Sequence, residues 1–178
     1  MIYVALLRGI NVGGNNRIAM ADLRATLASM GFASVATILQ SGNVVFEGTA
    51  TPTSKLESVL EKGIAKRHGI TPEVHVRTAD EWNAIVEANP FTAEAKKDPG
   101  HLLVSCYKAP LDTTRVKALQ SAIAGKERVH ADGRHLYMTF PDGIGTSKAA
   151  PLVDRMLTVK GTARNWNTVL KLARLVSA

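Results

Sequence analysis

The residues best suited to chemistry lie in one loop, Arg8 to Asn16, with the sequence Arg-Gly-Ile-Asn-Val-Gly-Gly-Asn-Asn. Glycine and asparagine accept positive φ angles, and glycine lets a ligand approach the main chain closely. Backbone N–H groups and a guanidinium could together cradle an anion, with Arg8, Asn11, Gly13 and Gly14 as ligand-binding residues. The loop lacks the spacing of a Walker or dinucleotide-binding motif. The alternative is a structural turn whose asparagine side chains satisfy the loop's own backbone.

A second candidate site lies near the end of the chain, in the segment Arg164-Asn165-Trp166-Asn167. Arg164, Asn165 and Asn167 could donate hydrogen bonds to an anionic ligand. Because a planar guanidinium suits a carboxylate or phosphate, we expect Arg164 and Arg8 to serve one shared anion site. Trp166 fits the apolar side of the helix that follows better than it fits a stacking surface.

Two further pairs of residues could contact an anion or a nucleic acid. Ser147 and Lys148 end a glycine-rich segment that enters a helix, where a hydroxyl can cap the helix and a lysine adds positive charge. Lys171 and Arg174 share one face of the last helix with Asn167. In both places a plainer alternative stays open, namely an ordinary capped helix for the first pair and a solvated surface for the second.

A predicted hairpin could present a basic and aromatic sheet face to single-stranded RNA. If Asp132-Gly133 is its two-residue loop, His130 pairs with His135 across the strands and Arg128 pairs with Tyr137. The alternative is that this face packs on the sheet of the other half. The two histidines do not suffice for a metal site, because no third ligand is evident.

The strand before this hairpin contains Cys106 and Tyr107. We expect Tyr107 to join the basic and aromatic face. Cys106 is the single cysteine of the chain and lies in an apolar segment, so it is expected to be a buried small hydrophobe and no disulfide framework exists.

The chain shows no convincing catalytic set. A nucleophile elbow, a His-Glu-x-x-His motif and a conspicuous acidic pair are all missing from the sequence. The leading prediction is therefore a binding protein for an anionic ligand, either nucleic acid or a phosphorylated small molecule, with no cofactor and no metal. The alternative is an enzyme that acts on a phosphorylated metabolite through electrostatic stabilisation, without a covalent nucleophile.

The charge of the chain is uneven. The net charge is +7; residues 1–89 carry eight basic and eight acidic side chains, and residues 90–178 carry fourteen and seven. The second half is thus the favoured place for an anionic partner, although a solvated basic surface would look the same. With 46% hydrophobic residues and no apolar run long enough to span a bilayer, we expect a soluble cytoplasmic protein with no membrane contact. The oligomeric state stays open.

The pattern of apolar residues predicts the same element order twice. In the first half we expect strands at Ile2–Leu7, Val35–Gln40, Asn43–Glu47 and Glu73–Arg77, and helices at Met20–Met30, Lys55–Arg67 and Asp80–Glu87. In the second half we expect strands at Leu102–Tyr107, Arg128–Ala131, Arg134–Phe140 and Thr158–Thr162, and helices at Thr114–Ile123, Lys148–Leu157 and Asn165–Leu175. Each half then reads β-α-β-β-α-β plus one helix, a ferredoxin-like unit of the α+β class.

Short local matches support the duplication. Thr53-Ser54-Lys55 and Thr146-Ser147-Lys148 both open a second helix, and Glu81-Trp82-Asn83 resembles Asn165-Trp166-Asn167. Ser54 with Glu57 has the spacing of a capping box. We predict one globule with a first repeat at residues 1–89, a turn-rich connector at 90–100 and a second repeat at 101–178.

Five segments resemble one family, domain of unknown function 1697. They are Arg8 to Gly14, Gln40 to Val44, Asn89-Pro90-Phe91, Gly145 to Lys148 and Arg164 to Thr168. The segments occur in the family's order and span nearly the whole chain. One departure is Thr162-Ala163, where the family often has two threonines. The resemblance implies a duplicated ferredoxin-like α+β fold in a mostly bacterial family, and it implies no established activity.

Overall fold

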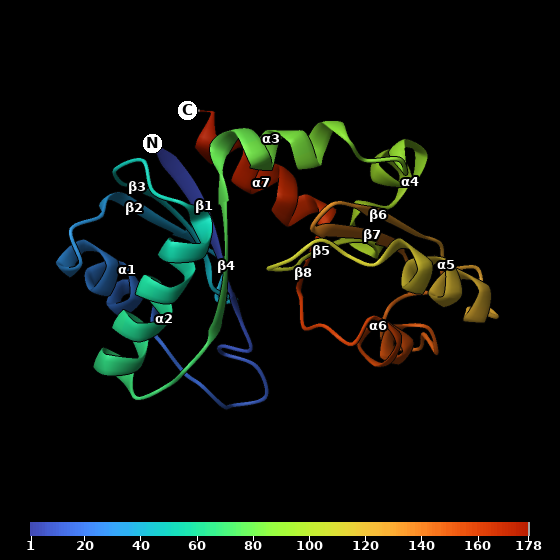
Figure 1. Cartoon of the computed structure of the whole chain (residues 1–178), viewed down its shortest axis with the longest axis horizontal. Coiled ribbons are helices and arrows are strands. Elements are labelled where there is room, and N and C mark those ends of the chain that lie inside the picture. The colour runs from blue at the N-terminus through green and yellow to red at the C-terminus, as the bar shows by residue number, and fades with distance from the viewer. Residues whose placement is uncertain (178) are drawn as a thin grey trace. The chain divides into compact units, whose positions relative to one another are not determined.

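The computed structural model of the chain describes residues 1–177, which form two compact units. The first unit comprises Met1–Ala84 and the residues from Leu172 onward, and the second comprises Ile85–Lys171. The described residues form two four-stranded antiparallel sheets and seven α-helices (Figure 1). The predicted α+β composition and the two similar halves are therefore confirmed.

The elements follow one another in a repeated order. The first unit contains β1 (Ile2–Arg8), α1 (Met20–Ser29), β2 (Ala33–Ile38), β3 (Asn43–Glu47), α2 (Thr53–His68) and β4 (Glu73–Thr78). The second contains α4 (Thr92–Lys97), the 3-10 helix η1 (Pro99–His101), β5 (Leu102–Cys106), α5 (Thr113–Ala122), β6 (Val129–Asp132), β7 (His135–Thr139), α6 (Ala150–Leu157) and β8 (Thr162–Asn165). Helices α3 (Ala79–Glu87) and α7 (Trp166–Val176) each run across a boundary between the units.

The two sheets have the same strand order. The first is β2-β3-β1-β4 and the second is β6-β7-β5-β8, and in both sheets every neighbouring pair is antiparallel. In the first sheet Val4 of the central strand lies opposite Arg77 of the edge strand. In the second sheet Val104 lies opposite Arg164. These pairings align the halves residue by residue.

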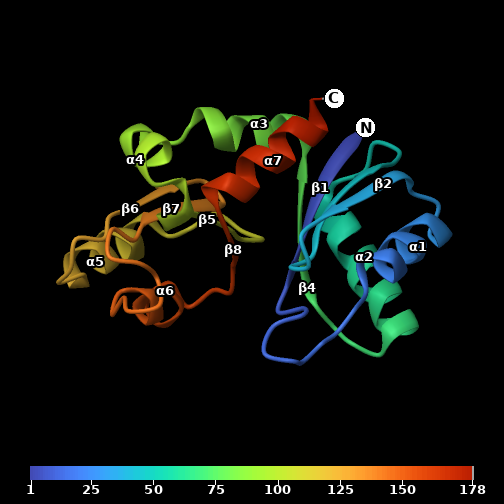
Figure 2. The same cartoon turned by 180° about the vertical axis from the view of Figure 1, so that it is seen from behind.

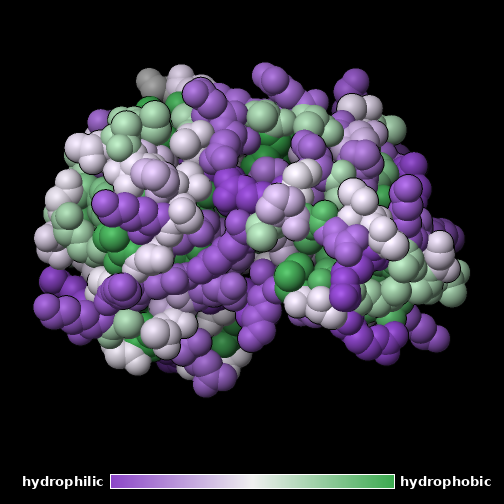
Figure 3. Space-filling model, in the orientation of Figure 1, coloured by the Kyte–Doolittle hydropathy of each residue, from purple (hydrophilic) through white to green (hydrophobic). Residues whose placement is uncertain are grey.

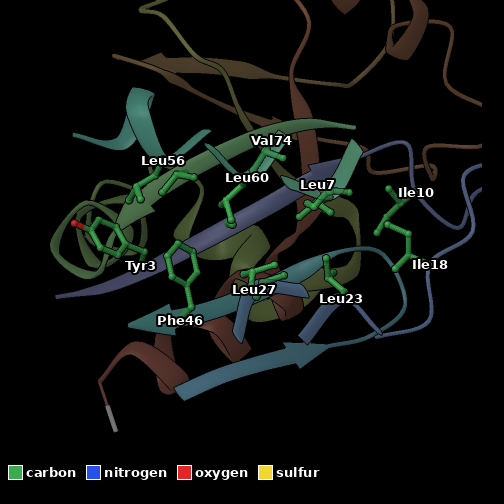
Figure 4. Packing of buried hydrophobic residues seen from close by; sticks show 14 of the residues in the cluster. Tyr3, Leu7, Ile10, Ile18, Leu23, Leu27, Phe46, Leu56, Leu60 and Val74 are labelled. Carbon is green, nitrogen blue, oxygen red and sulfur yellow. The ribbon is translucent and has the colours of Figure 1, made fainter. Parts of the chain in front are cut away.

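Two helices cover one face of each sheet, α1 and α2 in the first unit and α5 and α6 in the second (Figure 2). In the first unit, alternate residues of the buried strand β1 point toward the helices. Tyr3 and Leu7 meet Leu56 and Leu60 of α2 there, in a core that also takes in Ile10 of the following loop (Figure 4). Helix α2 ends at Gly69, whose φ of 67° is the left-handed conformation that glycine accepts at a helix C-terminus.

Three predicted details of secondary structure were wrong. The stretch from Pro90 to Gly100 is not only turns, because it contains α4 and the start of η1. The last strand runs from Thr162 to Asn165, later than the predicted Thr158–Thr162. Ser54 and Glu57 make no capping box, because α2 begins after Pro52 and the Glu57 carboxylate instead accepts a hydrogen bond of 2.9 Å from the N–H of Val76.

The predicted register of the second hairpin was wrong as well. Asp132 lies opposite His135, so the loop is Gly133 with Arg134, and His130 lies opposite Tyr137. Gly133 takes a φ of 52°, which the two-residue turn requires. His130 and His135 are therefore not a cross-strand pair.

Candidate functional site

The Arg8–Asn16 loop is held in shape by Asn11. Its side-chain nitrogen donates to the carbonyls of Ile18, at 2.9 Å, and Gln40, at 2.8 Å, while its side-chain oxygen accepts from the N–H of Ile18 at 2.9 Å. Asn16 donates to the carbonyl of Gly9 at 3.1 Å. Asn16 therefore bonds to the loop's own backbone, and Asn11 fixes the loop to Ile18 and Gln40.

Two glycines of this loop are exposed to solvent. Gly13 and Gly14 are exposed and adopt φ angles of 59° and 81°. A Cβ placed on Gly14 would lie 3.7 Å from the terminal nitrogen of Arg17, so the Arg17 guanidinium lies close to Gly14. Arg17 is exposed and was not among the predicted site residues.

A hollow of about 370 Å³ opens beside this arrangement. It is lined by Asn11, Gly14, Arg17, Ile18, Ala19 and Gln40. Ala19 is the N-cap of α1, and its side chain makes no cap hydrogen bond. The positive end of the α1 dipole and the Arg17 charge thus face the same hollow.

Arg8 ends β1 and lies opposite Glu73 of β4. The Nη1 atom of Arg8 is 4.0 Å from the Glu73 carboxylate, and about a third of each side chain is exposed (35% and 31%). An ion pair as open as this one contributes little to stability. Arg8 therefore keeps a guanidinium that solvent reaches, next to the glycine loop.

Arg164 lies within β8, in the second unit. Its Nη1 atom donates to the hydroxyl of Thr162 and to the carbonyl of Ala163, both at 2.8 Å. Burial lowers the pKa of Arg164 to about 10, which still leaves the guanidinium charged at neutral pH. Arg8 and Arg164 belong to different units, so the predicted shared site stays a prediction.

The asparagines that follow Arg164 have different surroundings. The side-chain oxygen of Asn165 accepts from the N–H and the hydroxyl of Thr168, both at 3.0 Å, and so caps the start of α7. Asn167 is exposed. Trp166 is buried, in agreement with its predicted place in the core. Lys171 and Arg174 are exposed, as predicted.

The Gly143–Lys148 segment forms one wall of a second hollow, of about 710 Å³. The Ser147 hydroxyl accepts from the N–H groups of Ala149, at 3.1 Å, and Ala150, at 3.4 Å, so it holds the turn before α6. The helix begins at Ala150, later than the predicted Lys148, and its N-cap is Ala149 rather than Ser147. The same hydroxyl makes a short hydrogen bond with the carboxylate of Glu127. Lys148 is exposed and lines the hollow.

The predicted basic and aromatic face of the second sheet is only partly present. The rings of His130 and Tyr137 lie 6.4 Å apart, and the Tyr137 hydroxyl donates to the carbonyl of Ile85 at 2.7 Å. Arg128 is not opposite Tyr137, because its backbone bonds to Thr139 instead. Tyr107 was also misplaced: it packs among the buried residues beneath α5 and α6, and burial raises its pKa to about 12.

A family model described as "Protein of unknown function (DUF1697)" matches residues 1–137, which is more than half of the chain. The chain belongs to this family. No curated protein matches it. A solved structure, "The structure of conserved bacterial protein SP0830 from Streptococcus pneumoniae", is similar with a TM-score of 0.72 and 23% identity, over 98% of each chain. At that identity the likeness shows the fold alone.

One cleft of this DUF1697 chain was missed by the sequence reasoning. It measures about 310 Å³ and lies beside α4, where the His101 Nδ1 atom is hydrogen-bonded to the Asp98 carboxylate at 2.6 Å. Nearby, Arg128 pairs with Glu94 and lies 4.9 Å from the ring centre of Phe91. The helical spacing of Glu94 and Lys97 along Thr92–Lys97 could have indicated α4, but the Asp-Pro-Gly turn after it favoured a connector.

Residues 1–177 of this DUF1697 chain contain neither a cluster of metal-binding side chains nor a helix able to span a membrane. No group of three His, Cys, Asp or Glu side chains is close enough to hold a metal ion. No described helix combines the length and apolar character that crossing a bilayer requires.

Proposed function

We propose that this DUF1697 protein binds an anionic ligand, either a phosphorylated small molecule or nucleic acid, at the Arg8–Ala19 loop. The observation that carries the proposal is that the Arg17 guanidinium lies close to Gly14, where both residues line the hollow at the start of α1. Exposed glycine main chain with positive φ lets an anion come close to backbone N–H groups. The guanidinium adds a fork of donors suited to phosphate oxygens.

The roles within this site follow from the contacts of each residue. Asn11 is a positioning residue, because its three hydrogen bonds hold the loop against Ile18 and Gln40. Gly13 and Gly14 would offer backbone N–H groups, and Arg8 would add charge from the end of β1. Such a site needs no nucleophile, which agrees with a binding role.

We also propose contacts to the same class of ligand in the second unit. Arg164, Asn165 and Asn167 form one group around the start of α7, although the helix cap formed by Asn165 leaves its amide nitrogen as the available donor. The further contacts that we propose are Ser147, Lys148, Lys171 and Arg174. The exposure of the two last residues supports their inclusion.

We further infer that each half is a ferredoxin-like unit. The strand order β2-β3-β1-β4, with β1 antiparallel to both of its neighbours, supports this inference, and so does the same order in the second sheet. We keep residues 1–89 and 101–178 as the proposed repeats, with residues 90–100 as their connector.

The proposal can be tested by thermal unfolding in inorganic phosphate, tripolyphosphate and chloride at equal ionic strength. A ligand that binds only the folded state raises the melting temperature with concentration. We expect tripolyphosphate to stabilise the wild type and Arg17→Gln to lose most of this response. Arg24→Gln is the matched control, since Arg24 is an exposed arginine further along α1. An equal response in Arg17→Gln and wild type, or no response in wild type, would contradict the proposal.

A further inference from the structure

The helices that cover the two sheets differ in length and in packing. Helix α2 has sixteen residues and buries Leu56, Leu60 and Ile64 against the first sheet. Helix α6, its counterpart, has eight residues, and Leu157 is its one fully buried side chain among the described residues. The second sheet is therefore covered less completely on its helix side.

The central strands of the two sheets differ in burial accordingly. With Val4 aligned to Val104, the positions of Tyr3 and Ala5 correspond to Leu103 and Ser105. Tyr3 and Ala5 are fully buried (0% exposed), whereas Leu103 and Ser105 are only partly buried. A central strand is normally the best covered part of a sheet, so its partial exposure marks a gap in the packing.

A hollow of about 200 Å³ occupies this gap, between the sheet and α6. Its walls include Leu103, Met138, Phe140 and Val153, and its polar groups include the hydroxyls of Ser105 and Tyr107. Figure 3 shows hydrophobic surface between β8 and α6. An apolar cavity of about 150 Å³ can accept a ligand of the size of benzene, so this hollow is large enough for one small ring.

A sequence difference between α2 and α6 explains why the rim of the hollow carries a charge. When Thr53-Ser54-Lys55 is aligned with Thr146-Ser147-Lys148, Val153 replaces Leu60 and Asp154 replaces Glu61. The Glu61 carboxylate accepts a hydrogen bond of 2.9 Å from the N–H of Val74 on the edge strand. Asp154 is one methylene shorter and exposed, and it lines the hollow.

The charge of the residues that line the hollow indicates which kind of ligand it would bind. Of the described residues that line this hollow, Asp154 alone is charged, although the chain as a whole is strongly basic. Its negative charge reaches the hollow, because after burial it is the next largest cause of the raised pKa of Tyr107. A carboxylate at the rim favours a cation, and the hydroxyl oxygens of Ser105 and Tyr107 can accept further hydrogen bonds from an ammonium group.

We propose that the hollow beneath α6 binds a small apolar primary amine, with one ring or branched chain against Leu103, Met138 and Val153 and its ammonium at Asp154. This site lies wholly in the second unit and takes the charge opposite to that of the proposed anion site. Each of the two proposals can therefore be tested, and rejected, independently of the other.

The test is a titration of the intact chain with 2-phenylethylamine, followed by two-dimensional amide NMR. The neutral 2-phenylethanol and the anionic phenylacetate serve as probes of the same shape. We expect the amine to bind with a Kd on the order of 1 mM, the alcohol about threefold to fivefold more weakly, and the acid not measurably. Amide shifts should centre on Ser105, Tyr107 and Asp154.

Two variants separate the parts of the site. Asp154→Asn should weaken the amine about threefold to fivefold and leave the alcohol unchanged, the effect expected of a partly exposed ion pair. Val153→Leu copies Leu60 of the first half and adds one methylene to the wall of the hollow, which should weaken the binding of both probes. Matched controls are Asp132→Asn and Val59→Leu, which alter exposed side chains away from the hollow.

The proposal fails if no probe shifts the wild-type amides, if the shifts centre elsewhere, or if Asp154→Asn binds the amine as tightly as wild type. It also fails if folded Val153→Leu binds both probes normally. Should Val153→Leu not fold, the wild-type shift map and Asp154→Asn decide the outcome.

Discussion

Arg77 and Arg164 occupy the same position in the two halves of the chain. Each lies on the edge strand opposite a valine of the central strand, Val4 or Val104. In each, Nη1 donates to the carbonyl of the preceding residue at 2.8 Å. The duplication therefore extends to the conformation of single side chains.

This alignment corrects one of the local matches that suggested the duplication. Trp82 follows Arg77 by five positions and Trp166 follows Arg164 by two, so the two tryptophans are not equivalent. The residues that do correspond are Thr78 and Asn165, each of which caps the next helix through its side chain. The two similar halves were correctly predicted, but the tryptophan match was wrong.

Arg77 is predicted to be important for stability. It is buried, and its Nη1 atom is 4.0 Å from the buried Glu57 carboxylate. Arg77→Met removes this cation from a buried anion and should lower the free energy of unfolding by about 3–5 kcal/mol. Urea denaturation measures the change, with Arg24→Met as the exposed control. A loss below about 1 kcal/mol, which is typical of surface pairs, would contradict the prediction.

Stability at high pH should depend on Tyr107. Burial, aided by Asp154, raises the pKa of its phenol from 10.0 to about 12. A phenol whose pKa is higher in the folded state contributes its full stabilisation below the unfolded pKa of 10.0. This contribution is lost as pH rises from about 10 toward 12, because the unfolded state then releases the proton more readily. The difference in unfolding free energy between wild type and Tyr107→Phe should therefore fall by about 2 kcal/mol across that range. A difference that does not change with pH would show that the phenol titrates normally.

Nucleic-acid binding, if it occurs, should be weak, salt-sensitive and dependent on α7. Lys171→Glu with Arg174→Glu should reduce binding to single-stranded RNA and flatten its salt dependence, because fewer phosphate counterions are released. Lys62→Glu with Lys66→Glu changes the net charge equally on α2 and is the control. Equal losses in both double variants would indicate a general charge effect. The absence of RNA binding by wild type at low salt would exclude nucleic acid as the ligand.

Local patterns predicted most of the elements, because burial follows short-range periodicity. The apolar run of β1 and the helical spacing of the apolar residues of α2 could both be recognised in the sequence. Contacts between distant segments were not visible. The pairing of Arg8 with Glu73 depends on the register of β1 with β4, and the role of Glu57 depends on where β4 passes α2.

The unusual backbone of the Arg8–Asn16 loop could be predicted from its glycine and asparagine content. Which side chain faces the hollow could not be predicted. The sequence favoured Arg8 because it directly precedes the first glycine of the loop, whereas the fold brings Arg17 close to Gly14. The cleft beside α4 was not predicted, because the turn residues of this segment indicated a connector and not the six-residue helix that is present.

The most direct test of the anion site is a titration of the isotope-labelled chain with tripolyphosphate, observed through the backbone amides. The account predicts that the amides of Gly13 and Gly14 shift first and saturate together, and that Arg17→Gln removes both shifts while the rest of the spectrum is retained. If the shifts instead arise only at α7 or the Gly143–Lys148 segment, or if Gly13 and Gly14 do not move at saturating ligand, the loop is a structural turn and the central claim is wrong.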